Sequence, residues 1–465
     1  FSIPILGKDD WTKNKKSIAA SIKKHQKALI SISDQIWANA ELALEEHKSS
    51  KILSDYAEKN GFNIERGVAG MPTAFIATYG SGRPRIGILG EFDANAGISQ
   101  KAQSTKEALI EGAPGHGCGH NLFGTGSLGA AIAIKELIQK KELKGTIVFY
   151  GTPAEETIFG KVWFARAGLF NDLDLCMDWH PGDDVEAGTQ SSKALIDFRV
   201  KYWGKAAHAS ADPWNGFSAV DGMELLTTGI NYYREHIKPT ARIHYQIEKA
   251  GDVVNVVPEK AQIWVRVREN DRESLNVLYE RVKKMAAAAA LMAEVDYDIE
   301  LISGIYEILP NRSGAKLVQN NFEMLGPILY TDEETEYAKA IQRATGKPEV
   351  GMDGAIHALK ETKPAQGGST DVGDVSQLVP VVRLSTPAAP KDAPWHSWAV
   401  VASTGMSIGH KGMLKASNAL GMTMVDLFEN PQLIKEVKAE FKERKGNSKY
   451  VPMIPPGPPP VPQKK

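Results

Sequence analysis

The sequence predicts an α/β protein: a main domain with a mostly parallel sheet flanked by helices, and a ferredoxin-like α+β domain inserted into it. Two patterns support this prediction. Before residue 190 and after residue 307, short apolar segments alternate with segments of helical periodicity, which is typical of a parallel sheet covered by helices. Between them, residues 191–306 predict the order strand, helix, strand, strand, helix, strand, which is the order of a ferredoxin-like unit.

The prediction divides the chain into three parts. Residues 1–190 and 307–450 form one discontinuous domain, residues 191–306 form the insertion, and residues 451–465 form a proline-rich tail. A proline-rich tail is expected to be extended or disordered. A chain of 465 residues exceeds what one ordinary hydrophobic core supports, which agrees with two domains.

The individual elements follow from periodicity and from the residues that end helices. Apolar side chains recur at helical spacing from Ile18 to Ile36, and a second helix over 49–59 ends at Asn60-Gly61, a pair suited to a helix C-terminus. In the main domain we expect further helices at 121–140, 333–345 and 410–428, and strands at 73–79, 85–92, 146–150, 173–178 and 381–384. In the insertion we expect strands at 194–202, 241–248, 262–268 and 295–302, and helices at 217–236 and 272–293.

Composition narrows the class of partner and substrate. The formal net charge of −1 offers no field for nucleic acid or an anionic membrane, and no apolar run reaches the roughly 18 residues of a bilayer span. A small-molecule or peptide substrate is therefore expected. The two cysteines exclude a disulfide framework, and Cys176, in an apolar run, is interpreted as a core residue. The chain starts at Phe1 rather than at methionine, so it is either cytoplasmic or, if a signal peptide was removed, periplasmic or secreted.

A group of potential metal ligands gives the clearest functional signal. Cys118 and His120 lie in a glycine-rich turn, where glycine lets the backbone fold tightly enough for both side chains to face one ion. His180 and the pair Glu155-Glu156 follow predicted strands, and the carboxyl ends of parallel strands meet at one sheet edge. Thiolate, imidazole and carboxylate are ligands of zinc, cobalt and manganese. Each feature alone could be an ordinary turn or a solvated acid; together they predict a metallohydrolase.

The paired carboxylates allow a division of labour. Beside an ion, one carboxylate can bind the metal while its neighbour accepts a proton from water. Further motifs accompany them in chain order: Gly90-Glu-Phe-Asp93-Ala94, His116-Gly-Cys-Gly-His120-Asn121, Trp179-His180-Pro181, Gly204-Lys-Ala-Ala-His208-Ala209, Ser369-Thr-Asp-Val-Gly-Asp-Val-Ser376 and Ser407-Ile-Gly-His-Lys-Gly-Met413.

Together these motifs resemble the co-catalytic metallopeptidase family of aminoacylases, glutamate carboxypeptidases and amino-acid-conjugate amidohydrolases. The resemblance covers roughly Ile30 to Phe441, and it is strongest to the branch that cleaves p-aminobenzoyl-glutamate. It implies a dimerisation or lid role for the insertion. It also implies two divalent ions per chain, zinc or manganese with cobalt possible, because these ligands do not select one metal.

The resemblance assigns the metal ligands and the catalytic base. It implies that Cys118 bridges two ions and that Glu155 is the general base. The last histidine ligand is His396, in a His-Ser step typical of the family, with His410 as the rival. The remaining ligands it implies are His120, Glu156 and His180.

One motif departs from many relatives, which have His-x-Asp after the second strand. Here the segment is Glu91-Phe92-Asp93. Asp93 keeps the acidic residue that supports the metal site, but Glu91 replaces the usual first ligand. His120 can supply the missing imidazole, as in the amidohydrolase branch.

In the insertion, the resemblance assigns substrate-binding residues. His208 matches a residue that reaches across a dimer interface to polarise the scissile carbonyl. Asn255 and Arg268 match positions that hold a substrate carboxylate, a role that suits the planar fork of arginine. On their own, His208 could be a hydrogen-bonded loop residue and Arg268 a solvated strand residue.

The function implied is metal-dependent hydrolysis of N-acyl amino acids or dipeptides with a free carboxylate, with p-aminobenzoyl-glutamate the first candidate. The enzymatic alternative is a dipeptidase of the β-alanyl-lysine type. A third interpretation is a catalytically silent subunit of a heterodimeric hydrolase, which the presence of both a base and a full ligand set argues against. The expected assembly is a homodimer or a heterodimer with an A-like subunit.

Overall fold

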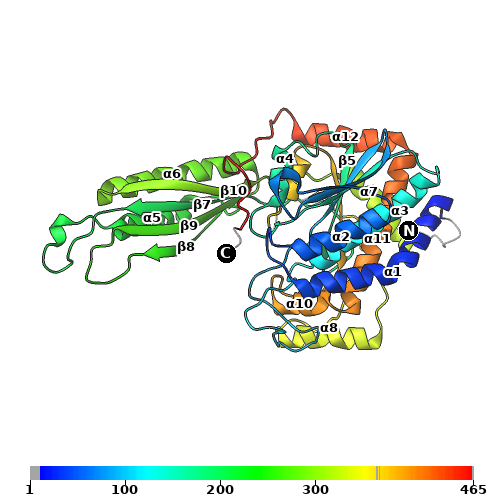
Figure 1. Cartoon of the computed structure of the whole chain (residues 1–465), viewed down its shortest axis with the longest axis horizontal. Coiled ribbons are helices and arrows are strands. Elements are labelled where there is room, and N and C mark those ends of the chain that lie inside the picture. The colour runs from blue at the N-terminus through cyan, green and yellow to red at the C-terminus, as the bar shows by residue number, and fades with distance from the viewer. Residues whose placement is uncertain (1–10, 363–364, 366, 463–465) are drawn as a thin grey trace.

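The computed structural model describes residues 11–362, 365 and 367–462. Figure 1 shows a larger part built on one sheet, and a smaller part that projects from it and holds a second sheet. Within the described residues, no helix combines the length and the apolarity that a bilayer span requires.

The first sheet has seven strands in the order β1-β2-β4-β3-β5-β11-β6. Its centre is parallel, because β3 pairs in parallel with β4 and β5, and β5 pairs in parallel with β11. β1, β2 and β6 add antiparallel edges. The strands are β1 (Asn63–Arg66), β2 (Phe75–Ser81), β3 (Arg85–Gly90), β4 (Gly145–Gly151), β5 (Leu175–Gly182), β6 (Glu186–Ala187) and β11 (Val381–Pro387).

Helices surround this sheet and bury its apolar strands. β4 is buried along its whole length, as expected for a strand covered on both faces. α3 packs closely against α1 and α11: a Cβ on Gly129 of α3 would lie 2.8 Å from Leu29 of α1 and 3.2 Å from Ser417 of α11. The helices are α1 (Lys13–Asn39), α2 (His47–Lys59), α3 (His120–Gln139), α4 (Gly160–Arg166), α7 (Arg312–Leu325), α8 (Asp332–Ala344), α9 (Val372–Ser376), α10 (Trp398–Thr404), α11 (Ser407–Glu429) and α12 (Pro431–Lys445).

The second sheet has four antiparallel strands in the order β10-β7-β9-β8. Alternate residues of β9 are buried under α5 and α6, from Ala261 to Val267, so the side chains of Arg266 and Arg268 lie on the opposite face. The elements are β7 (Ala194–Trp203), α5 (Ala219–Tyr233), β8 (Arg242–Ala250), β9 (Lys260–Glu269), α6 (Arg272–Ala293) and β10 (Asp296–Ile305).

The structure confirms the predicted fold class, with a mostly parallel sheet and an inserted βαββαβ unit. Most predicted boundaries differ from the observed ones by up to three residues, and the largest difference is at the end of β5. The strand expected to end at residue 178 continues to Gly182, because His180 and Pro181 pair with Ser385 and Thr386 of β11. His180 therefore lies within β5 rather than in the loop after it.

The proline-rich segment 451–462 contains no helix or strand and lies along the junction of the two sheets. Met453 forms a bridge with Gly304 at the end of β10. Arg166 of α4 donates hydrogen bonds to the carbonyl oxygens of Pro455 and Gly457. The described part of the tail therefore contacts both parts of the molecule.

Candidate metal centre and active site

The predicted ligands meet at the carboxyl ends of the parallel strands. Glu91 and Asp93 follow β3, Glu155 and Glu156 follow β4, and His180 lies near the end of β5. This edge is where open α/β sheets place their ligands. Chain topology thus brings together residues that are far apart in the sequence.

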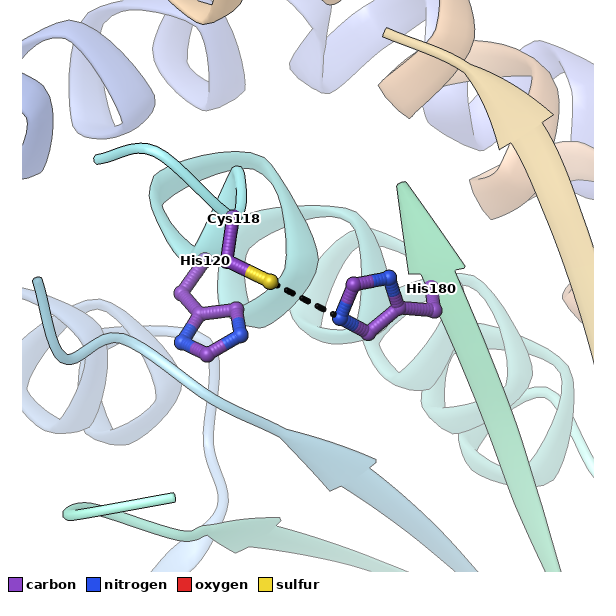
Figure 2. Close-up of side chains that lie close together, drawn as sticks. All are labelled: Cys118, His120 and His180. Atoms are coloured by element: carbon purple, nitrogen blue, oxygen red, sulfur yellow. Dashed lines mark hydrogen bonds between the residues drawn. The ribbon is translucent and has the colours of Figure 1, made fainter. Parts of the chain in front are cut away.

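The first group of potential ligands is formed by Cys118, His120 and His180, whose donor atoms lie within 4.8 Å of one another (Figure 2). The Cys118 Sγ is 3.5 Å from the His180 Nε2. Gly119, between the first two ligands, has a φ of +76°, and a Cβ there would lie 2.9 Å from Pro181. Glycine therefore allows the turn to approach β5 this closely.

A second group consists of Cys118, Glu156 and His396. The His396 Nε2 is 3.5 Å from the Glu156 Oε2. His396 has a φ of +54°, which is uncommon for a residue other than glycine, and its backbone N–H donates to the carbonyl of Gly117. Cys118 thus belongs to both groups of potential ligands.

Asp93 connects the two groups through hydrogen bonds. Its Oδ1 accepts from the Nδ1 of His120 at 2.9 Å, and its Oδ2 accepts from the backbone N–H of Glu156 at 2.9 Å. The Nδ1 of His180 similarly donates to the carbonyl of Pro181 at 2.8 Å. In both histidines the Nε2 lone pair is thereby left for a metal, which is the arrangement that supporting residues commonly enforce.

Buried atoms without partners test whether these residues fit a metal. The His120 Nε2, the Glu91 Oε2 and the Glu156 Oε1 are all buried and lack a hydrogen-bond partner. The first two of these atoms lie 3.0 Å apart. Buried polar atoms are nearly always paired, so three such atoms without hydrogen-bond partners among the described residues favour a further binding partner. A divalent cation bound by nitrogen, oxygen and sulfur ligands meets this need.

The electrostatics also favour a cation. Burial, together with the charge of Glu156, raises the pKa of the Cys118 thiol. Burial and the neighbouring Glu91 and Glu156 likewise raise the pKa of the Glu155 carboxyl well above its usual range. Burial lowers the pKa of His180 to about 4, so this imidazole is neutral and able to ligate at neutral pH. A bound cation would stabilise the ionised forms of Cys118 and Glu155.

One buried cation does lie beside the cluster. Lys161, the second residue of α4, is fully buried and its Nζ contacts the Glu91 Oε1 and, at 2.7 Å, the Asp371 Oδ1. Although burial acts to raise the pKa of Glu91, the charges of Lys161 and His120 hold it well below its usual range. Glu91 is therefore an ionised carboxylate inside the protein.

A cavity of about 640 Å³ opens from the cluster toward the second sheet. Cys118, Glu155 and His396 line its metal end. Arg268 of β9 lines its other side, and the Arg268 Nε is buried without a hydrogen-bond partner. Apolar wall is provided by Phe159, Leu195 and Ile308.

Comparison with known proteins agrees with a metal-dependent hydrolase site. Residues 103–397 match the family described as peptidase family M20/M25/M40. The chain belongs to this family. It is 35% identical to the B subunit of p-aminobenzoyl-glutamate hydrolase from Escherichia coli, over 96% of this chain and 98% of that protein. It is 28% identical to human Xaa-Arg dipeptidase, over 93% of each.

A solved structure shares the fold. It is that of a Bacillus subtilis protein described as a dinuclear metal-binding peptidase of family M20. The match has a TM-score of 0.58 and 18% identity and covers 88% of this chain and 99% of that one. The resemblance stated from the motifs is thus confirmed at the level of family and fold.

Two residues expected in an M20 site lie elsewhere in this chain. His208 and Asn255 are exposed. They lie in two neighbouring loops, one between β7 and α5 and one between β8 and β9, at the outer end of the insertion (Figure 1). His208 bridges to Val256, and the Ala209 N–H donates to the Asn255 carbonyl. Neither lines the cavity. A single chain does not bring them to the metal cluster, and their assigned roles stay predictions that need a second chain.

Two further histidines, His410 and His116, lie outside the groups of potential ligands. His410, the rival for the last ligand, pairs with Asp34 at 2.8 Å and belongs to none of the ligand groups. His116 is buried, and its Nε2 lies 3.0 Å from the carbonyl of Ile36. The geometry therefore groups His396, rather than either of these, with Cys118 and Glu156.

Three buried charged residues around the site were missed by sequence reasoning. Lys161 could have been noticed as a lone lysine in an apolar segment, Gly160 to Ala165. Asp371 lies in a quoted motif but was given no role. Glu46 accepts from the Thr73 hydroxyl and from the backbone N–H of Ala154, and no local pattern marks it.

Proposed function

We propose that this protein is a metal-dependent amide hydrolase that cleaves N-acyl amino acids with a free carboxylate, p-aminobenzoyl-glutamate foremost. The observation that carries the proposal is the pair of ligand groups that share Cys118, beside Glu155 and open to a cavity lined by Arg268. The 35% identity to the B subunit of p-aminobenzoyl-glutamate hydrolase supports the choice of substrate.

Two divalent ions would be held by five side chains. Cys118 would contact both ions, with His120 and His180 on one side and Glu156 and His396 on the other. Zinc and manganese suit this set, and cobalt is also compatible. Bound ions supply Lewis acidity, which acidifies water and polarises a carbonyl group.

Glu155 is the group placed to move the proton. It lines the same cavity as Cys118 and is buried, and its ionised carboxylate can accept a proton from water. The same carboxyl can then deliver this proton to the leaving amine, as a general base and acid in turn. Asp93 would act by fixing the orientation of His120 and the backbone of Glu156.

Arg268 would bind the free carboxylate of the substrate. Arg266 and Arg383, which also line the cavity, are paired with Asp197 and Asp178, whereas the Arg268 Nε has no partner. A glutamate carboxylate can supply one. The walls at Phe159, Leu195 and Ile308 would contact an aromatic acyl group.

The second candidate is a dipeptidase, which the 28% identity to Xaa-Arg dipeptidase favours. A cationic leaving amino acid would meet the guanidinium groups that line this cavity, and like charges repel in a partly buried site. A glutamate leaving group avoids this repulsion. We therefore rank the dipeptidase below the acyl-glutamate hydrolase.

The complete site would include a partner chain. His208 would polarise the scissile carbonyl and Asn255 would assist in binding the carboxylate, both from the outer end of a second chain's insertion. That chain is a second copy or an A-like subunit, since the Escherichia coli relative is named as one of two kinds of subunit, A and B. A catalytically silent subunit remains the third candidate.

The test is hydrolysis by the metal-loaded protein of p-aminobenzoyl-glutamate, p-aminobenzoyl-arginine and β-alanyl-lysine, with the released amino acid measured. We expect p-aminobenzoyl-glutamate to have the highest kcat/KM. Preference for arginine or lysine release would establish the dipeptidase instead. If the protein takes up no metal during loading and hydrolyses none of these substrates, the silent subunit would be favoured.

A further inference from the structure

We propose that Glu91 is itself a metal ligand, through its Oε2, and that Lys161 and Asp371 hold it in place. The inference rests on the proposed metal centre and adds to it a ligand where many relatives have a histidine. It adds Glu91 to the ligands of the ion that His120 would bind, while Glu155 keeps its role as general base. The donor atoms of Glu91, His120 and Glu155 lie within 4.8 Å of one another.

The contact between Glu91 and His120 is the first observation. The Glu91 Oε2 lies 3.0 Å from the His120 Nε2, and both residues are buried. The two atoms lack the alignment of a hydrogen bond, and each has no other hydrogen-bond partner. The His120 Nδ1 donates to Asp93, so the Nε2 is the ring atom that faces the Glu91 Oε2. Either a proton or a metal ion beside these atoms removes the repulsion between their lone pairs, and a proton on Nε2 would favour the aligned hydrogen bond that is absent here.

The distance fits two atoms that share an ion. Zinc lies about 2.0–2.2 Å from nitrogen and carboxylate ligands, which places two neighbouring ligand atoms about 3.0 Å apart at a ligand–metal–ligand angle near 90° and about 3.4 Å apart at the tetrahedral angle. The ion lies along the lone pair of the ring nitrogen, so a second ligand oxygen lies to the side of that direction. This explains why the contact is close and is not a hydrogen bond.

Lys161 determines which oxygen of Glu91 is free. Its Nζ contacts the Oε1, so the Oε2 alone is directed toward His120. Asp371 holds Lys161 twice: its Oδ1 accepts from the Nζ at 2.7 Å and its Oδ2 accepts from the Lys161 backbone N–H at 2.8 Å. Lys161 thus positions the carboxylate, in the way that supporting residues orient metal ligands.

A third unpaired atom faces the same place. The Glu156 Oε1 is buried without a hydrogen-bond partner and lies 3.9 Å from the His120 Nε2. By contrast, the nearby buried Glu46 has both oxygens satisfied, by the Thr73 hydroxyl at 2.8 Å and the Ala154 N–H at 3.0 Å. Glu46 is therefore a matched control: a buried glutamate near the site with no oxygen left for a metal.

The test compares the variants Glu91→Gln and Glu46→Gln with the unchanged protein. Each is stripped of metal, checked for folding by circular dichroism, and titrated with Co²⁺ against a chromophoric chelator. We expect Glu91→Gln to weaken one of the two Co²⁺ sites by at least about tenfold and to change its visible absorption bands. The thiolate-to-cobalt absorption from Cys118 should persist. Glu46→Gln should match the unchanged protein in both affinity and spectrum.

Unchanged Co²⁺ affinity and spectrum in folded Glu91→Gln would overturn the proposal. If that variant does not fold, the unchanged protein decides by anomalous diffraction after zinc loading. An ion about 2.0–2.2 Å from the Glu91 Oε2 supports the proposal, and an ion beyond reach of that atom overturns it. Because these readouts are independent of turnover, failure of the acyl-glutamate activity with Glu91 still bound to metal would reject only the proposed function.

Discussion

The metal cluster and the outer end of the insertion differ in almost every physical property, although the family resemblance assigns catalytic residues to both. His120, Glu91 and Asp93 are buried, and their atoms are fixed by contacts from several elements. His208 and Asn255 are exposed in loops that contact mainly each other. One chain therefore preorganises the candidate metal ligands, whereas the role proposed for His208 would require a second chain.

The largest effect is expected from changing the proton-transfer group of the buried region. Glu155→Ala should lower kcat by roughly 10²–10⁴-fold, the usual contribution of a general acid or base. Metal content should stay unchanged, because Cys118, Glu156 and the histidines are retained. Steady-state kinetics and elemental analysis of the same sample measure both. Near-normal turnover would remove Glu155 from the mechanism.

The division between the two regions can be tested by mixing chains. His208→Ala should reduce turnover by about 10²–10³-fold, as loss of a group that stabilises a developing oxyanion does. The His208→Ala chains are mixed with an equal amount of Glu155→Ala chains and allowed to exchange subunits. If each site takes His208 from the other copy, half of the dimers are mixed and each mixed dimer has one intact site of two. The mixture should therefore recover about one quarter of the activity of the unchanged protein.

The matched control for this mixture is each variant exchanged with itself, which should stay inactive. An inactive mixture despite proven exchange would show that His208 does not act across an interface between copies.

A smaller effect is expected where the two regions meet, at Arg268. Arg268→Met should raise KM for p-aminobenzoyl-glutamate by about 10–100-fold, because a hydrogen bond to a charged group contributes about 1.5–3 kcal/mol. Arg266→Met serves as the comparison, since its guanidinium is already paired with Asp197. Equal effects of the two changes would argue against a specific carboxylate contact at Arg268.

The smallest effect concerns stability and follows from exposure. His208→Ala and Asn255→Ala should change the free energy of unfolding by no more than about 0.5 kcal/mol, as surface substitutions do.

Metal removal should lower the Tm of the unchanged protein and of both variants, because an ion bound only by the folded state stabilises that state. Thermal unfolding with and without a chelator measures both. A large loss of stability in either variant would mean that the outer loops are structural.

Sequence reasoning predicted the fold well where periodicity was strong. The insertion was predicted element by element, and the helix at 272–293 has the observed bounds of α6. Five helices were not predicted: α4, α7, α9, α10 and α12. Three of them, α4, α9 and α10, have seven residues or fewer, too short for periodicity to show. In α12 only Ile434 and Val437 are buried, whereas α7 is amphipathic and its spacing could have been recognised. β5 was predicted too short because its last residues, His180 and Pro181, are unusual in a strand.

For the site, the sequence could identify donors but not the charges that surround them. Cys118, His120 and Glu156 stand in recognisable motifs, and the structure groups them as potential ligands. Lys161 and Asp371 are 210 positions apart and meet Glu91 only through the fold. Such a buried network has no local pattern, so sequence alone treated Glu91 as a lost ligand rather than as a candidate one.

The most direct test of the account measures metal stoichiometry and turnover in one sample of the reconstituted protein with p-aminobenzoyl-glutamate. The account predicts two divalent ions per chain and release of p-aminobenzoate and glutamate in equal amounts. A protein that folds and assembles but binds no ions, or that binds two ions and leaves this substrate intact while cleaving a dipeptide, would contradict it.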